Sequence, residues 1–385
     1  MRTRAPVRVN AVAALTAFAV LTGCSGAPAP VPAPAPVPAP SPPAPMVLSG
    51  WERVALPDGM RASSVALVDR TIVVGGHAGT GADRVPAMAR GEAADPRFRA
   101  TDVRPRSPYG AKADLVSVVG TGSSVVALGA AHGGAHANFR WTIWSGSPER
   151  IVDRPQNFDA FGGEEAGGLQ DVAWDSTGPM IVGSWQGAHG LDGRIWRVAD
   201  DRWTRQPPVP ALTNTATRQV APRAAETRHD AIVISGSVIE LSGGVRQSAA
   251  IWRGAGAQWA LTVLPDPGRR SEAWSTDCAA ACATLGSRDG SAAVWEGPTR
   301  ASLPELGVDD HDNGVIIIDG GRTIAALSSA GRGRLLVGQA GHWSSYTAPD
   351  GVVRSALLVG SRLYLVSDDD GGALWARDLA DVLPR

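Results

Sequence analysis

Residues 181–205 read IVGSWQGAHGLDGRIWRVADDRWTR, and this stretch predicts three consecutive β-strands. The first strand closes on Val182-Gly183, the second is centred on Trp196 and the third on Trp203. The segments between them contain Gly and Asp, which favour tight hairpins over helices. The stretch therefore reads as part of an antiparallel sheet.

The same unit recurs along the chain. Strands that end in an aliphatic residue followed by Gly or Ser recur at intervals of roughly 40–55 residues. These aliphatic residues are Val74, Leu128, Val182, Ile234, Leu285, Leu327 and Val366. A large apolar residue follows in the next strand of each unit, namely Met88, Trp144, Trp196, Trp252, Trp295, Leu336 and Trp375. Further apolar runs before and after these strands bring each unit to four strands.

Seven four-stranded units predict an all-β fold, a seven-bladed β-propeller with antiparallel blades. Stacked blades bury their central strands on both faces, which explains apolar runs such as residues 71–74 and 315–318. A parallel α/β fold is disfavoured because no long segment with helical periodicity follows the leader. A β-sandwich would not repeat its strands as seven matched quartets.

The two ends of the repeat region predict how the ring closes. The last unit stops after its third strand, near Trp375. Residues 50–57, GWERVALP, resemble the fourth strand of an earlier unit, QWALTVLP at residues 258–265. We therefore expect the N-terminal strand to complete the last blade, which removes two open sheet edges.

The chain is expected to have three parts: residues 1–23, 24–49 and 50–385. Arginines precede an apolar core at residues 11–21, and Leu21-Thr22-Gly23-Cys24 follows. This segment resembles the bacterial lipoprotein signal, and the resemblance implies cleavage before Cys24 and a diacylglycerol on its sulfur. Two acyl chains give stable anchoring, so the expected location is the outer face of the cell membrane. An ordinary cleaved signal peptide with an incidental cysteine is the alternative.

Residues 27–45, APAPVPAPAPVPAPSPPAP, are a low-complexity proline-rich segment. Such a composition favours an extended polyproline II conformation, which rises about 3.1 Å per residue and would span about 60 Å here. We interpret the segment as a spacer between the membrane and residues 50–385, the propeller domain.

Charge and motifs exclude several classes of function. The chain has 36 Lys and Arg residues against 37 Asp and Glu residues, with no basic stripe, which argues against nucleic-acid binding. It contains no Gly-x-Ser-x-Gly, no His-Glu-x-x-His and no phosphate-binding loop, so nucleophilic and phosphoryl-transfer enzymes gain no support. We expect no cofactor and a monomeric protein.

The two remaining cysteines, Cys278 and Cys282, flank three alanines at the first hairpin of the fifth unit. Export favours oxidation, and a hairpin brings such positions within disulfide reach. We therefore predict a disulfide; two small buried thiols are the alternative. The pair alone lacks the further ligands that a zinc site needs.

Histidines and acidic residues gather in loops that a propeller would place on one rim, where second-to-third-strand loops and blade connections lie. The histidines in loops of the first three units are His77, His132, His136 and His189. Across the ring the same rim would carry Asp289, Asp309, His311, Asp368 and Asp370. Imidazoles with carboxylates suit a transition metal. Asp and His beside Gly are also common turn residues, and we predict no metal site.

Residues 309–314, DDHDNG, partly match a calcium-binding loop. His311 occupies the third position of that loop, and Gly320 stands where the bidentate Glu belongs. We therefore interpret the segment as a solvated turn.

The connection at residues 156–168, QNFDAFGGEEAGG, combines two phenylalanines with Asp159, Glu164 and Glu165. Aromatic rings beside carboxylates on a rim loop suit a sugar or a peptide, and paired carboxylates also suit glycoside hydrolysis. Adjacent glutamates need not face each other, however. The second long connection, residues 208–226, is rich in Ala, Thr, Pro and Arg and is compatible with a flexible lid.

Most tryptophans recur at matched strand positions, so we expect them to pack between blades. They are Trp144, Trp196, Trp252, Trp295 and Trp375. Trp185 departs from this register and lies in a rim loop near His189, so we expect it to be exposed.

Two hairpins resemble the Asp-box motif of sialidase-type propellers, Ser-x-Asp-x-Gly-x-x-Trp. They are residues 287–295, SRDGSAAVW, and 367–375, SDDDGGALW. Both place Trp one residue late, and the first places Gly one residue early. The resemblance implies a folding element remote from catalysis. Sialidases also need three arginines and a Tyr-Glu pair, and the positions of Tyr109, Tyr346 and Tyr364 do not assemble one.

The sequence thus favours a non-catalytic binding or scaffold lipoprotein whose propeller rim holds a protein, a cell-wall glycan or a small ligand. The alternative is an extracytoplasmic hydrolase or lyase of the sialidase-like propeller type, which would act on glycans through rim carboxylates and histidines.

Overall fold

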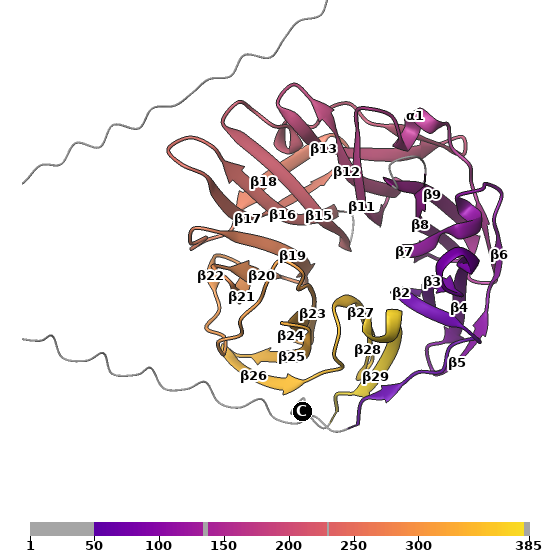
Figure 1. Cartoon of the computed structure of the whole chain (residues 1–385). Coiled ribbons are helices and arrows are strands. Elements are labelled where there is room, and N and C mark those ends of the chain that lie inside the picture. Colours follow the sequence, from indigo (N-terminus) through magenta and orange to yellow (C-terminus); the bar gives the residue numbers. More distant parts are fainter. Residues whose placement is uncertain (1–49, 134–137, 229–230, 381–385) are drawn as a thin grey trace, which may run out of the picture. The chain divides into compact units, whose positions relative to one another are not determined.

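A computed structural model describes residues 50–133, 138–228 and 231–380, and these form a seven-bladed β-propeller (Figure 1). Seven antiparallel sheets follow one another around a centre in chain order, from indigo to yellow. The predicted fold class is therefore confirmed. The leader, Cys24 and the proline-rich segment lie outside the described residues, and so does His136.

The first three blades take up the N-terminal half of the propeller. Blade 1 consists of β2 (Met60–Val68), β3 (Thr71–Ala78), β4 (Val85–Glu92) and β5 (Asp95–Ala100). Blade 2 consists of β7 (Asp114–Thr121), β8 (Ser124–Gly133), β9 (Asn138–Ser147) and β10 (Arg150–Asp153). Blade 3 consists of β11 (Ala166–Asp175), β12 (Gly178–Gly187), β13 (Gly190–Ala199) and β14 (Arg202–Arg205).

The remaining blades repeat the pattern. Blade 4 consists of β15 (Arg218–Arg228), β16 (Ala231–Glu240), β17 (Arg246–Ala255) and β18 (Gln258–Val263). Blade 5 consists of β19 (Ser271–Cys278), β20 (Cys282–Arg288), β21 (Ser291–Glu296) and β22 (Thr299–Arg300). Blade 6 consists of β23 (Gly314–Asp319), β24 (Arg322–Ser329), β25 (Arg332–Gln339) and β26 (His342–Thr347). Blade 7 contains β27 (Val353–Val359), β28 (Arg362–Ser367) and β29 (Ala373–Asp378).

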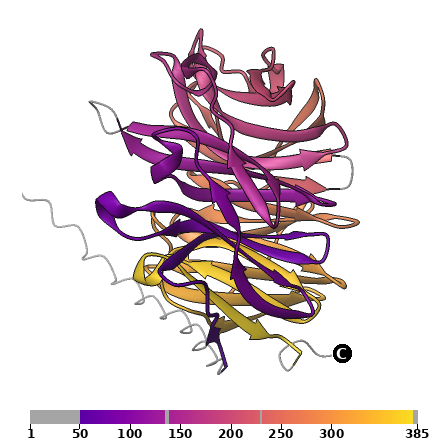
Figure 2. The same cartoon turned by 90° about the vertical axis from the view of Figure 1, so that its right-hand side faces the viewer.

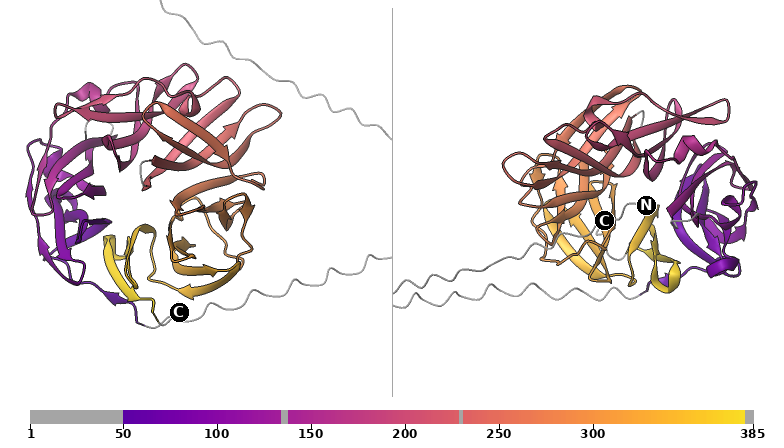
Figure 3. Two further views of the ribbon diagram at one scale, coloured as in Figure 1. Left: turned by 180° about the vertical axis from the view of Figure 1, so that it is seen from behind. Right: turned by 45° about the horizontal axis from the view of Figure 1, so that its top comes forward.

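The N-terminal strand β1 (Glu52–Arg53) closes the ring as predicted. It pairs antiparallel with β29, and Arg53 lies opposite Trp375. The indole Nε1 of Trp51 donates to the backbone oxygen of Thr347, 3.2 Å away, at the end of β26 in blade 6. On the other side of blade 7, β2 contacts β27 and β28, so the described part of blade 7 has a neighbouring blade on both faces. Figure 3 shows this junction from behind.

Two features of the strands and connections differ from the sequence-based expectations. A fifth strand, β6 (Asp102–Arg104), pairs in parallel with the outer edge of β10 in blade 2. The connection at residues 208–226 is no flexible lid, because its second half belongs to β15 and its first half contains a short 3-10 turn at Pro210–Leu212. The lid interpretation is therefore wrong.

The blades stack against one another (Figure 2), and the core lies between them, where the second and third strands are buried on both faces. Trp196, Trp252 and Trp295 are at most 1% exposed. Each indole Nε1 donates across 2.8 Å to a backbone oxygen in the connection that precedes its blade, at Ala160, Ala211 and Pro265 respectively. Trp144 is also fully buried, and the half-buried Trp375 packs on the core between blades 6 and 7. The predicted packing role is confirmed.

Polar side chains join the innermost strands around the centre. Six of these strands contain a register shift, and in most of them a Ser or Asp follows it. Ser64 Oγ donates to the backbone oxygen of Leu115 in the next blade, and Ser117 Oγ donates to Asp171. Burial raises the pKa of Asp171, although hydrogen bonds from Ala225, Ser117 and Val172 oppose the shift.

We use the term upper rim for the end of the ring at which each innermost strand begins, and lower rim for the opposite end. Because neighbouring strands are antiparallel, the second-to-third-strand loops and the blade connections also lie on the upper rim. Within the described residues, no helix is long and apolar enough to cross a bilayer. The only α-helical segment there, α1 (Phe158–Phe161), lies in the connection between blades 2 and 3.

Candidate ligand-binding site

The predicted rim histidines that fall within the described residues lie at or near the upper rim, but they do not converge. His77 is only 5% exposed, and its Nδ1 lies 3.3 Å from Asp114 Oδ2. The His132 ring stacks on Phe139, with 4.3 Å between ring centroids, whereas His189 is exposed on blade 3. Among the described residues, no group of three or more His, Cys, Asp or Glu side chains is arranged to hold a metal ion.

In the two Asp-box-like hairpins, an aspartate side chain accepts hydrogen bonds from backbone N–H groups. Asp289 Oδ1 accepts from the backbone N–H groups of Arg270 and Arg269, at 3.0 and 2.9 Å. These hydrogen bonds lower the pKa of Asp289. Asp368 Oδ1 accepts from the N–H of Val352 at 2.6 Å. Both aspartates tie a second-to-third-strand turn to the segment that enters the same blade.

The remaining acidic rim residues also have local partners. Asp309 Oδ1 accepts from the N–H of His311 at 2.8 Å, within the turn that enters blade 6. Asp312 in the same turn is 2% exposed. Asp370 lies 3.6 Å from Arg53, in an exposed ion pair beside the closing strand.

The expectation that Trp185 is exposed is wrong. Only 6% of this residue is exposed, because Arg205 covers one ring face, with its guanidinium carbon 3.8 Å from the ring centroid. The indole Nε1 donates to Glu165 Oε2 at 2.9 Å. Glu165 thereby ties the connection after α1 to blade 3, while Asp159 and Glu164 are exposed.

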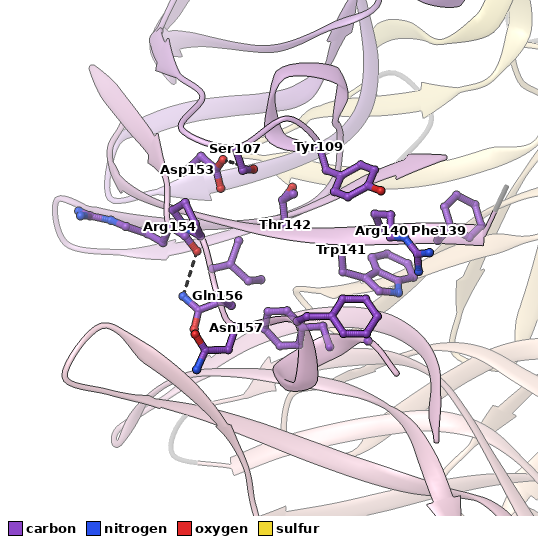
Figure 4. A pocket seen from close by; sticks show the side chains of 15 residues that line it. Ser107, Tyr109, Phe139, Arg140, Trp141, Thr142, Asp153, Arg154, Gln156 and Asn157 are labelled. Carbon is purple, nitrogen blue, oxygen red and sulfur yellow. Dashed lines mark hydrogen bonds between the residues drawn. The ribbon is translucent and has the colours of Figure 1, made fainter. Parts of the chain in front are cut away.

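A pocket of about 250 Å³ opens beside α1 (Figure 4). It lies between the connection that enters blade 2 and the connection that leaves it. Aromatic rings line it, and three of them are strongly exposed: Phe158 at 67%, Phe139 at 51% and Tyr109 at 39%. Trp141 stacks against Phe139, with 5.4 Å between ring centroids. We call this cavity the rim pocket.

The pocket is open because β10 is short. Within β9, only residues 144–147 pair with β10. The outer edge of residues 139–143 therefore has no β10 residue beside it. The backbone N–H of Arg154 donates to the oxygen of Ile143, and the chain then turns away toward α1. The Gln156 side chain fixes this turn through the backbone oxygens of Arg154 and Asp201 and the N–H of Trp203.

Three charged residues line the rim pocket, and one of them, Arg154, has a neutral partner, because its Nε donates to Ser145 Oγ at 2.8 Å. Asp153 is 1% exposed, and its Oδ2 accepts from Ser107 Oγ at 2.6 Å and from the N–H of Arg106 at 3.1 Å. Its Oδ1 is buried and has no hydrogen-bond partner among the described residues. The Arg140 guanidinium lies 6.0 Å from the centre of the Tyr109 ring and 5.8 Å from that of Phe158.

A second cavity of about 430 Å³ occupies the centre of the ring, and the innermost strands line it. The charged residues that line it have partners within the protein: Asp171 accepts from Ser117 Oγ and from the N–H of Ala225, Asp277 Oδ2 accepts from the N–H of Ile318 at 2.8 Å, and Arg354 Nη2 lies 2.7 Å from Asp368. Nearby, Arg223 pairs with Glu272 and donates to Asn313 Oδ1, and thus links blades 4, 5 and 6. These contacts stabilise the ring, so the rim pocket is the better candidate for a ligand site.

Sequence reasoning identified the α1 side of the rim pocket and missed the other side. Phe158 and Asp159 were among the residues of the predicted aromatic and acidic loop. Tyr109, Arg140 and Asp153 were not, because they join Phe158 only through the packing of blade 2 against blade 3. The exposed aromatic at Phe139, next to a rim loop, was the one signal in the sequence.

No family model and no curated protein sequence matches this chain. Solved propellers resemble it in fold. A Trypanosoma rangeli sialidase in complex with sialic acid is 11% identical, with a TM-score of 0.44, over 88% of this chain and 60% of that one. The β-propeller domain of the trilobed protease from Pyrococcus furiosus is 10% identical, with a TM-score of 0.46, over 83% and 96%.

The polysaccharide lyase Uly1 is 9% identical, with a TM-score of 0.47, over 83% of this chain and 90% of that one. The chain spans about three fifths of the length of the sialidase it matches. Similarity at this level concerns the fold alone and assigns no activity.

Proposed function

We propose that this protein is a membrane-anchored extracytoplasmic lipoprotein whose propeller binds a cell-wall glycan in the rim pocket. The observation that supports this proposal is the combination of exposed aromatic faces with a buried, unpartnered carboxylate oxygen. Phe139, Phe158 and Tyr109 offer apolar faces, and Asp153 Oδ1 offers an acceptor. A sugar ring presents C–H groups on its faces and hydroxyl donors at its edge, which matches both features.

The size and the rigidity of the pocket agree with this proposal. A volume of about 250 Å³ accommodates one or two sugar rings rather than a protein domain. Binding pockets typically combine apolar walls with a few fixed polar groups, which set the orientation of the ligand. Here the hydrogen bonds of Ser107 and Arg106 already fix the Asp153 carboxylate, so little side-chain ordering accompanies binding.

Binding is favoured over the alternative, glycan hydrolysis or elimination. Hydrolysis by the usual mechanism needs two carboxyl groups on opposite sides of the scissile bond. Asp153 is the only carboxylate that lines the rim pocket within the described residues, and Glu165 is engaged by Trp185. Turnover of cell-wall oligosaccharides by the purified chain, lost in Asp153→Asn, would favour the enzyme instead.

Replacement of one exposed ring tests the proposal. Phe158→Ala should weaken the binding of cell-wall oligosaccharides about tenfold or more, because an aromatic contact at the centre of a site often contributes 2 kcal/mol or more. The melting temperature should stay unchanged because the ring is 67% exposed. Val245→Ala is the control, since this residue is 78% exposed on the upper rim of blade 4. Equal affinities of both variants in calorimetry would refute the assignment of the site.

The proposed anchor needs a separate experiment because it concerns residues outside the described part. Mass spectrometry of the protein from membranes should find a diacylglycerol on Cys24, and Cys24→Ser should release the protein from the membrane fraction. An unmodified Cys24 would contradict the anchor while leaving the binding proposal intact.

A further inference from the structure

Arg140 differs from the other arginines that stack on aromatic rings. Arg223, over Trp274, is paired with Glu272, and Arg362, over Tyr364, is paired with Glu52. Burial and the nearby Arg194 lower the pKa of Arg205, which lies over Trp185, while the carboxylates of Glu165 and Asp159 oppose this shift.

Arg140 itself has no carboxylate within 4.0 Å among the described residues. The neighbouring residues 134–137, Gly-Ala-His-Ala, contribute no acidic side chain by sequence. The rings of Tyr109 and Phe158 flank the guanidinium, and stacking leaves its in-plane N–H groups available. The pocket thus contains a half-buried cation without a counter-ion from the described residues.

The Asp153 carboxylate, whose Oδ1 has no partner among the described residues, lies at the other end of the pocket. Asp153 pairs with Trp144 in the ladder between β10 and β9, and Arg140 precedes Trp144 by four residues on β9. A strand rises about 3.3 Å per residue, so the two backbone positions are about 13 Å apart. Because both side chains line the pocket, its ends differ in charge, with a cation toward the upper rim and a carboxylate oxygen deeper.

We propose that the rim pocket selects an acidic saccharide, with the sugar carboxylate at Arg140 and a hydroxyl or ammonium donor at Asp153 Oδ1. This inference rests on the proposed glycan-binding function and narrows its ligand class. Arginine binds a carboxylate through two parallel N–H donors, and the aromatic walls exclude water from that contact. Asp153 repels a second carboxylate, so the ligand enters in one orientation. The carboxylate belongs either to a uronic acid or to a lactyl ether on an amino sugar.

The test compares each acid with its own methyl ester, because esterification removes the charge and keeps the sugar. Calorimetry with the full chain at low ionic strength uses a glucuronic-acid disaccharide, N-acetylmuramic acid and both methyl esters. We expect at least one acid to bind about tenfold or more tightly than its ester, as for a charge-assisted hydrogen bond. The pair that shows the difference identifies which carboxylate carrier the pocket takes.

Two arginine variants locate the effect. Arg140→Gln should weaken acid binding about tenfold or more and ester binding far less, so that acid and ester then bind with similar affinity. Arg150→Gln is the matched control, since Arg150 lies on β10 in an exposed ion pair with Asp102, outside the pocket lining. Asp153→Asn should weaken acid and ester alike; melting curves of all three variants establish that they fold.

The outcomes separate this inference from the proposed function. If acid and ester bind equally, or if Arg140→Gln weakens both equally, the acidic ligand class is wrong and glycan binding stands. If no saccharide binds in either form, both proposals fail. If an acidic peptide binds through Arg140 more tightly than either sugar, the ligand is a peptide and the inference is overturned.

Discussion

At the scale of single residues, the blade tryptophans act both as packing groups and as clamps. Trp196 and Trp252 occupy equivalent positions in adjacent blades, and each donates to the connection before its blade. Only the Trp196 bond ends at Ala160, within α1, the segment that carries Phe158 into the rim pocket. The same side-chain interaction therefore has a structural role in blade 4 and an additional positioning role in blade 3.

Trp196→Phe and Trp252→Phe form a matched pair that tests this difference. Each change keeps an aromatic ring and leaves one backbone oxygen without its donor, which should cost about 1–3 kcal/mol in urea unfolding. Only Trp196→Phe should also weaken saccharide binding, because α1 loses its tie to blade 3. Equal losses of affinity in the two variants would show that Trp196 does not position the site.

The buried ion pair between Asp175 and Arg197 predicts a pH dependence. Burial disfavours the Asp175 carboxylate, but hydrogen bonds from Arg197 and Thr177 outweigh burial and lower its pKa. A depressed folded-state pKa contributes stability above the unfolded value, near 3.9, and that stability is lost as the pH falls through the folded value. Asp175→Asn should cost about 3 kcal/mol at pH 7, because it leaves Arg197 buried and unpaired.

Thermal melts of the wild type and Asp175→Asn from pH 7 to pH 3 measure this contribution. The gap in melting temperature should be widest at neutral pH and should narrow below about pH 4. Asp95→Asn is the control, because Asp95 forms only an exposed ion pair with Arg97. A gap that stays constant with pH would contradict the assignment.

At the scale of elements, periodicity predicted strands well and predicted short or atypical segments poorly. The alternation of apolar strands with glycine turns identified the central strands of all seven blades, because burial on both faces leaves continuous apolar runs. It missed β6 (Asp102–Arg104), because two of its three residues are charged and it pairs in parallel with the outer edge of β10. It also misjudged Trp185, because the arginine that covers it comes from β14, a different strand of the blade.

The hairpin between β19 and β20 contains the disulfide Cys278–Cys282 on the lower rim, opposite the rim pocket. It closes a loop of only a few residues, for which chain entropy gives a stabilisation of about 2 kcal/mol at most. The double change to serine should therefore lower stability slightly and leave saccharide affinity unchanged. Urea unfolding and calorimetry under oxidising conditions provide the measurement; a loss of binding would place the hairpin in contact with the site.

At the scale of the whole propeller, the ring can be derived from the sequence more fully than the site can. Seven matched units and a displaced fourth strand define blade number and closure, since both depend on repeated local patterns. The rim pocket depends on which side chains meet across two blades. Tyr109, Arg140 and Phe158 are far apart in the chain and meet only because blade 2 stacks on blade 3. Patterns in a single sequence do not reveal such contacts between residues that are distant in the chain.

Ring closure by β1 predicts a sharp difference between two truncations. Removal of residues 1–49 keeps the closing strand, whereas removal of residues 1–56 also deletes Trp51, Val54 and Leu56, which pack on blades 1, 6 and 7. The second truncation exposes the edge of β29 and apolar surface worth about 4 kcal/mol. For a domain of this size the melting temperature should fall by about 5 °C, and the exposed edge should promote aggregation. Calorimetry and light scattering that fail to distinguish the two truncations would show that β1 does not hold the ring together.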